Sequence, residues 1–171
     1  MKILNLLLII AVAVLSNHNS TMAKEWVVEP PPKQVIGELT NIDESELTKR
    51  RNVIEKYLSP SSSDKYKSVA GKLGLLRALI EQKVFDSTNT YELQCMGIIF
   101  GDAFVQELDM HWIIVEDEMG RDPAIRLGNS SIIMYPMTMI SKRIEREEEI
   151  DVFELFNGLV ENIKDLEKTA D

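Results

Sequence analysis

The chain has 171 residues and a formal net charge of −9, and 44% of its residues are hydrophobic and 27% are charged. These values are ordinary for one globular domain. The negative charge disfavours nucleic acid and anionic membrane surfaces as partners. It is compatible with a basic protein or a cation as partner, or with solubility alone.

Residues 1–23 have the pattern of a secretory signal peptide. Lys2 precedes an apolar run that reaches Leu15 and is interrupted only by Asn5. The run is shorter than the roughly 20 apolar residues that a membrane span needs. Thr21 and Ala23 are small residues placed before a cleavage site. We expect cleavage after Ala23, no transmembrane segment in the mature chain, and a periplasmic or secreted protein; the alternative is a buried N-terminal helix.

Residues 24–41 are expected to form a Pro-rich arm, because Pro30, Pro31 and Pro32 enforce an extended segment. A single domain over 42–171 should follow. Its first helix is expected to start at Asp43, which with Glu46 resembles a capping box. The outer face of this helix carries four basic residues, which we interpret as a solvated face: Lys49, Arg50, Arg51 and Lys56.

Two more helices precede the sheet. The spacing of Val69, Leu73, Leu76 and Ile80 predicts one that ends near Lys83. The next should run from a cap at Asn89 to about Leu108 and be buried nearly all round, because 95–105 contains one charged residue. Its glycines at 97 and 101 indicate close approach to a neighbouring element. Within it, Cys95 is the only cysteine, so no internal disulfide is possible and the thiol is expected to be buried.

The stretch 108–126 predicts a hairpin. Apolar residues on both alternating faces from His111 indicate a central strand, and Gly120 permits the reversal. Pro123 should be the first residue of the returning strand. After the hairpin we predict a third strand over 131–135 and two amphipathic helices, the last of them capped by Asp151. Together the elements predict an α+β fold in which helices pack on a small antiparallel sheet of about three strands.

Catalytic groups are scarce in this sequence. His111 would be the only histidine after cleavage, which excludes a zinc site built on several imidazoles. Asp102, Glu107 and Asp109 lie before the central strand, so a small carboxylate-dependent envelope hydrolase is an alternative. No catalytic residue, cofactor or metal ligand is assigned, and whether the protein is an enzyme is left uncertain, leaning towards no.

The hairpin holds the candidate binding residues. They are Trp112, Glu116, Asp117, Glu118, Arg121, Asp122 and Arg126. In a structural interpretation, Arg121 and Asp122 pair with the acids before Gly120, and Arg126 pairs with Glu116 or Asp117. In a functional interpretation, the turn is a recognition tip. The acids lack the spaced loop that would indicate a calcium site.

The same residues carry a family resemblance. The segments GDAFVQELDMHW (101–112), VEDEMGRDPAIR (115–126) and MYPMTMISKRIE (134–145) resemble the bacterial domain of unknown function 3806, over about residues 75–156. The resemblance implies a small α+β domain in exported or envelope proteins and brings no assigned activity.

Export, small size, acidity and few catalytic groups together favour a non-catalytic protein-binding function. We expect an inhibitor, an immunity-type protein or an envelope adaptor whose partner is another protein. A purely structural envelope protein is a further alternative.

Overall fold

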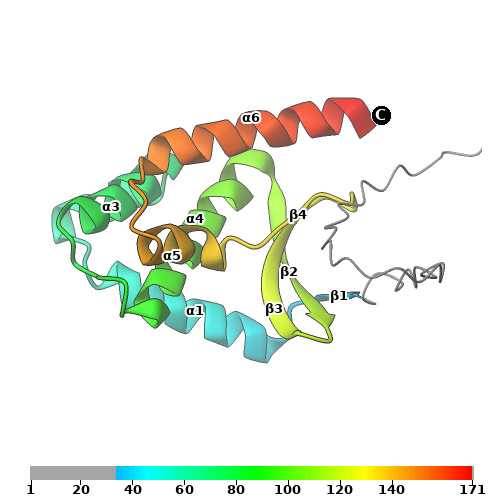
Figure 1. Ribbon diagram of the computed structural model, residues 1–171, viewed down its shortest axis with the longest axis horizontal. Helices are drawn as coiled ribbons and strands as arrows, with labels where there is room; N and C mark the ends of the chain where they lie inside the picture. The colour runs from blue at the N-terminus through cyan, green and yellow to red at the C-terminus, as the bar shows by residue number, and fades with distance from the viewer. Residues whose placement is uncertain (1–33, 171) are drawn as a thin grey trace, which may run out of the picture. The chain divides into compact units, whose positions relative to one another are not determined.

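The computed structural model describes residues 34–170, which form a four-stranded antiparallel sheet and a set of helices (Figure 1). The helices are α1 (Asn41–Glu55), α2 (Ser63–Tyr66), α3 (Val69–Glu81), α4 (Thr90–Leu108), α5 (Met137–Glu145) and α6 (Val152–Ala170), with a 3-10 turn at Pro60–Ser62. The predicted signal peptide and residues 24–33 lie outside the described residues. The α+β class and the antiparallel sheet are confirmed.

The strands follow one another across the sheet in chain order. They are β1 (Val35–Glu38), β2 (Met110–Asp117), β3 (Gly120–Leu127) and β4 (Ile133–Met134). β2 lies between β1 and β3, as the prediction of a central strand requires, and its hairpin with β3 closes at the pair Asp117 and Gly120. The third predicted strand, 131–135, is shortened to the two residues of β4.

The fourth strand, β1, comes from the segment that we expected to be an arm. Residues 35–38 pair with 113–116 of β2, so the arm prediction is wrong for the part of it that the structure describes. The prolines end at Pro32, and each residue from 35 to 38 has a backbone N–H that can join the ladder. Sheet pairing with a segment about 80 residues away has no local sequence signal.

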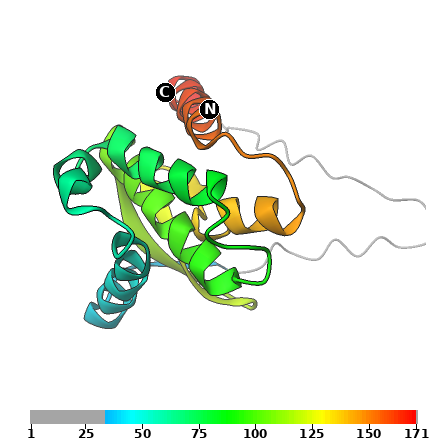
Figure 2. The same ribbon diagram turned by 90° about the vertical axis from the view of Figure 1, so that its left-hand side faces the viewer.

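α4 is the centre of the helical layer. It lies between α6 and α1, with α3 on one side and the sheet on the other, and Figure 2 shows the same grouping from a second direction. Its buried Phe100 and Phe104 pack edge to face at 5.0 Å between ring centroids, and Phe104 meets Phe156 of α6 at 4.5 Å. The prediction of a helix buried nearly all round is confirmed.

The two glycines of α4 mark its closest contacts. A Cβ at Gly97 would lie 2.5 Å from the backbone oxygens of Pro136 and Met137, at the start of α5. At Gly101 a Cβ would lie 2.6 Å from the Trp112 ring. The close approach predicted from their spacing is therefore present, with α5 and β2 as the neighbours.

Two details of the predicted elements are wrong. The capping box of α1 is formed by Thr40 and Asp43, three residues earlier than expected. Pro123 lies inside β3, paired with Ile114, and does not begin the strand. Only Ile125 and Arg126 pair with β4, so the missing N–H of Pro123 removes no hydrogen bond to that strand.

Both faces of β2 carry apolar side chains, as predicted. Trp112 contributes to the main core under the helices, while Ile113, Val115 and Ala124 form a separate cluster on the other face. None of the helices over residues 34–170 is long and apolar enough to span a membrane.

Candidate functional site

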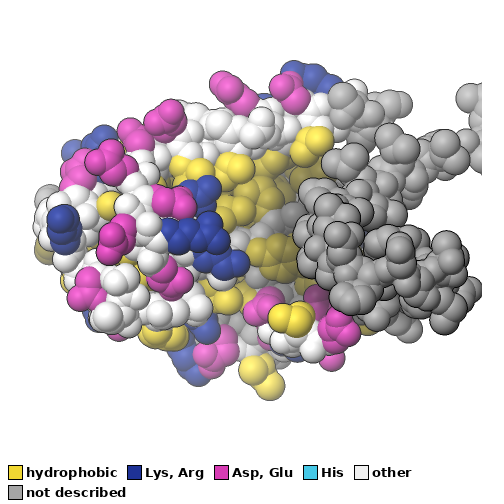
Figure 3. All heavy atoms as spheres, in the orientation of Figure 1, with side chains coloured by type: hydrophobic (Ala, Val, Ile, Leu, Met, Phe, Trp, Pro, Cys, Tyr) yellow, Lys and Arg dark blue, Asp and Glu magenta, His cyan; other side chains and the backbone are white. Residues whose placement is uncertain are grey.

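The turn between β2 and β3 presents acidic side chains around one exposed apolar residue. Glu116, Glu118 and Asp122 are exposed, and Met119 is 88% exposed. Asp117 stabilises the turn, because its Oδ1 accepts a hydrogen bond from the Met119 N–H at 2.8 Å. Figure 3 shows acidic side chains gathered at this end of the molecule. We call Glu116, Asp117, Glu118, Met119 and Asp122 the hairpin tip.

Arg121 holds the hairpin against α1. Its Nη2 donates to Oδ2 of Asp43 at 2.7 Å, and its Nη1 donates to Oδ1 of the same carboxylate. Thr40 also donates to Asp43 Oδ2, through its hydroxyl at 2.6 Å and its backbone N–H at 2.7 Å. The hydrogen bond from Arg121, followed by those from Thr40, holds the pKa of Asp43 well below its usual range.

The expected pairing of Arg121 with the acids before Gly120 is therefore wrong. Glu116 lies opposite Arg121 in the strand register, yet the guanidinium reaches Asp43 instead. Asp43 offers both carboxylate oxygens in a position already set by Thr40, which favours a bidentate pair. We call the contact between Arg121 and Asp43 the hairpin clamp.

Arg126 is not near the hairpin tip. It lies opposite His111 near the other end of the strands, and its guanidinium donates to the carbonyls of Asn129 and Ser130, both at 2.7 Å. The expected pair with Glu116 or Asp117 is wrong, because these acids lie five and six positions along the hairpin ladder from His111, the residue opposite Arg126. Arg126 instead stabilises the turn between β3 and β4.

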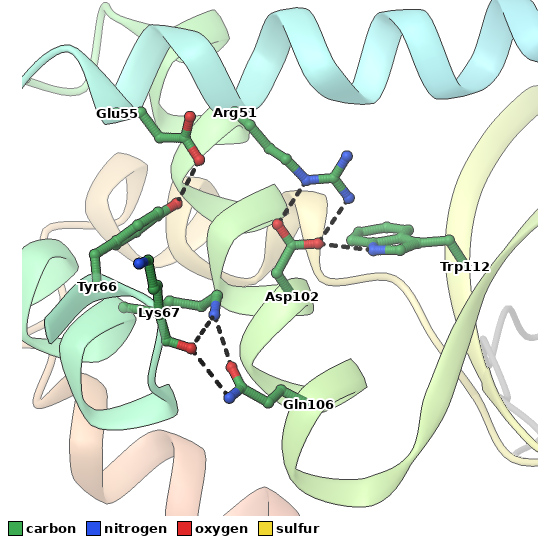
Figure 4. A network of polar contacts seen from close by, with 8 residues as sticks. Arg51, Glu55, Tyr66, Lys67, Asp102, Gln106 and Trp112 are labelled. Atoms are coloured by element: carbon green, nitrogen blue, oxygen red, sulfur yellow. Dashed lines mark hydrogen bonds and ion pairs between the residues drawn. The ribbon is translucent and has the colours of Figure 1, made fainter. Parts of the chain in front are cut away.

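Trp112 is part of a partly buried polar junction. This residue is 9% exposed, and its Nε1 donates to Asp102 Oδ1 at 2.9 Å. Asp102 also accepts from Arg51, whose Nε lies 2.7 Å from Oδ2 and whose Nη2 lies 2.8 Å from Oδ1 (Figure 4). One carboxylate thus joins α1, α4 and β2. This junction is not among the features predicted from the sequence, and the solvated face predicted for Arg51 is wrong, because its side chain is only 27% exposed.

Further polar contacts extend from the junction along the helices (Figure 4). The Tyr66 hydroxyl donates to Glu55 at 3.0 Å, and Lys72 donates to Gln106 at 2.7 Å. Burial, together with the Glu55 charge, raises the pKa of Tyr66 well above its usual range, and burial lowers the pKa of Lys72. These contacts tie α2 and α3 to α1 and α4, and the polar groups satisfy one another.

The acids considered for a hydrolase do not meet in one place. Asp102 pairs with Arg51 of α1, whereas Glu107 lies 3.9 Å from Lys164 of α6. Asp109 ends α4 in the left-handed conformation, with φ of 52°. Over residues 34–170, no group of three or more His, Cys, Asp or Glu side chains is placed to hold a metal ion.

The fold resembles a solved structure. A crystal structure of a protein from Bacteroides thetaiotaomicron VPI-5482 matches with a TM-score of 0.61 and 11% identity, over 81% of this chain and 51% of that one. This chain therefore spans about half the length of that protein, and the likeness concerns the fold alone. No curated protein matches the chain. Residues 72–156 match the family model described as "Domain of unknown function (DUF3806)", so the predicted resemblance to this family is confirmed.

Proposed function

We propose that this chain is an exported, non-catalytic protein-binding domain whose hairpin tip contacts a basic region of another protein. The observation that carries the proposal is the exposed Met119 surrounded by exposed acids. Protein interfaces combine an apolar contact with a polar rim, and complementary charge increases the rate and specificity of association. An inhibitor, an immunity-type protein or an envelope adaptor would use such a surface.

The hairpin clamp supports this proposal, because it limits the motion of the tip. A two-stranded hairpin alone is marginally stable, but here Arg121 fixes the base of the tip to α1 through two hydrogen bonds. A preorganised surface loses less conformational entropy on binding. Trp112 and Arg126 are placed in the core and in a distant turn, so we do not include them in the contact surface.

The export part of the proposal rests on the pattern of residues 1–23. It is tested by expressing the full chain with a C-terminal tag in its own organism and measuring the intact mass of the purified protein. Loss of residues 1–23 is the expected result. A protein that keeps Met1 in the envelope fraction would contradict the proposed cleavage.

The binding part is tested with the same tagged protein, recovered from an envelope extract in moderate salt. We expect one stoichiometric partner with a basic surface, which is released as the salt concentration rises. Glu118→Lys and Met119→Ser should each lose the partner. Glu161→Lys, which reverses an exposed acid on α6, is the matched control and should keep it. A partner that both tip variants retain would refute the proposed surface, and the absence of any partner would favour a structural role.

A further inference from the structure

A second surface, separate from the hairpin tip, lies between α5 and α6. Two adjoining hollows of about 420 and 380 Å³ run along these helices, and Arg143 lines both. Figure 3 shows apolar side chains in the space between α6 and α5, beside a group of Lys and Arg side chains. We call the two hollows together the α5–α6 groove.

The apolar walls of the groove come from two sources. On one side are Leu155 and Leu159, each directly before a buried residue of α6, so they lie one step round the helix from the buried stripe. On the other side are Ile133 and Met139, from β4 and α5. All four are partly buried, so each keeps apolar surface that a partner could cover.

The two edges of the groove carry opposite charge. Lys142, Arg143 and Arg146 form a basic edge at the last turn of α5, whereas the acids lie at the start of α6: Glu149, Asp151 and Glu154. The basic edge is a local patch of positive charge on a chain whose net charge is −9. Arg146 and Glu148 lie 3.8 Å apart and both are largely exposed, so this pair does little to neutralise the edge.

We propose that the α5–α6 groove binds an amphipathic helix of another protein, with acidic residues along the side of that helix that meets Lys142, Arg143 and Arg146. Leucine-type residues spaced i, i+4 and i+7 on such a helix would cover Leu155 and Leu159, the mode of recognition seen where a helix lies in an apolar groove. Two concave grooves facing each other would leave a space between them, so a second copy of this chain is a poor occupant.

The probes are two synthetic helical peptides with the same leucine stripe. One, the glutamate peptide, carries glutamates along the flank that would meet the basic edge and lysines along the opposite flank, and the other carries glutamine at all of these positions. Fluorescence anisotropy of the labelled peptides against the purified mature chain should show that the glutamate peptide binds at least about tenfold tighter, because its two flanks are complementary in charge to the two edges of the groove.

Two variants and one control make the test specific. Lys142→Glu/Arg146→Glu should abolish the preference for the glutamate peptide, and Leu155→Ser/Leu159→Ser should weaken both peptides. Lys65→Glu/Lys83→Glu reverses the same number of exposed positive charges away from the groove and should leave the preference unchanged. Circular dichroism confirms that each variant is folded.

Equal binding of the two peptides would overturn the proposal, as would undiminished binding to the leucine variant. Self-association in sedimentation experiments that the leucine variant abolishes would also overturn it, in favour of an interface between two copies. Because none of these measurements involves Glu118 or Met119, failure here is distinguishable from failure of the hairpin tip as a binding surface.

Discussion

Gly97→Ala is the sharpest test of how α4 packs. The added methyl would lie 2.5 Å from two carbonyl oxygens and 2.6 Å from the Met137 Cα, all of them backbone atoms. Ordinary contacts of a methyl carbon begin at roughly 3.5 Å, so α5 would have to move by about 1 Å. A side chain could rotate away from the methyl, but a backbone segment joined to β4 cannot do so without disturbing other contacts.

The expected cost follows from this overlap. Overpacking a well-packed core costs about 1–3 kcal/mol, and here it falls on backbone atoms, while alanine in a helix regains up to about 1 kcal/mol relative to glycine. We therefore expect Gly97→Ala to lower the free energy of unfolding by about 2 kcal/mol. For a domain of this size that corresponds to a fall of roughly 4–8 °C in Tm.

Gly74→Ala is the matched control. It lies inside α3, and a Cβ there would meet nothing within 4 Å. This variant should gain stability by up to about 1 kcal/mol through helix propensity alone. Urea unfolding of both variants, followed by far-UV circular dichroism, measures the two changes. If Gly97→Ala were as stable as Gly74→Ala, α4 could not lie as close to α5 as described.

Three further predictions concern the polar contacts. Asp102→Ala should lower the free energy of unfolding in urea by about 2–3 kcal/mol, since it leaves Arg51 and the Trp112 N–H without their acceptor. Asp102→Asn keeps an acceptor for the indole and should cost about half as much. Equal costs for the two variants would contradict this account. The pKa of Asp43 is lowered by the hydrogen bond from Arg121. The contribution of the Asp43 carboxylate to folding stability is therefore fully present above the unfolded pKa of about 4, and it is lost as the pH falls through the lower folded pKa. The stability difference between wild type and Asp43→Asn should therefore be constant from about pH 7 to 5 and shrink in strong acid, and a difference that grew there would reverse the sign of our argument. Finally, Arg121→Ala should speed hydrogen exchange of the amides in the hairpin turn, and unchanged exchange would mean that the clamp does not restrain the tip.

Local pattern accounts for the parts of the fold that were predicted correctly. The apolar run from Cys95 to Val105 indicated a buried helix, and the alternation after His111 with Gly120 indicated the hairpin. These signals depend on helix and strand periodicity and on backbone freedom at one glycine. Even the close approach at Gly97 could be inferred from the sequence, although its neighbour could not.

The polar side chains of the candidate site were harder to place. The acids and arginines of the hairpin could be identified from the sequence, but the pairs predicted for them were between residues close together in the chain. Arg121 instead pairs with Asp43, 78 positions away, and Arg51 with Asp102, 51 positions away. A long charged side chain can reach several acids on different elements, so the nearest acid in sequence need not be the nearest in space.

The sequence by itself determined the class of fold, the central hairpin and the buried helix, because each depends on the order of apolar and polar residues over a few turns or strand positions. Only the tertiary structure decided that residues 35–38 complete the sheet, that the hairpin is clamped to α1, and that α5 and α6 enclose a groove with edges of opposite charge. Those features depend on which distant segments of the chain pack against each other around α4. The free energy of that packing is a property of the whole core and not of any one segment.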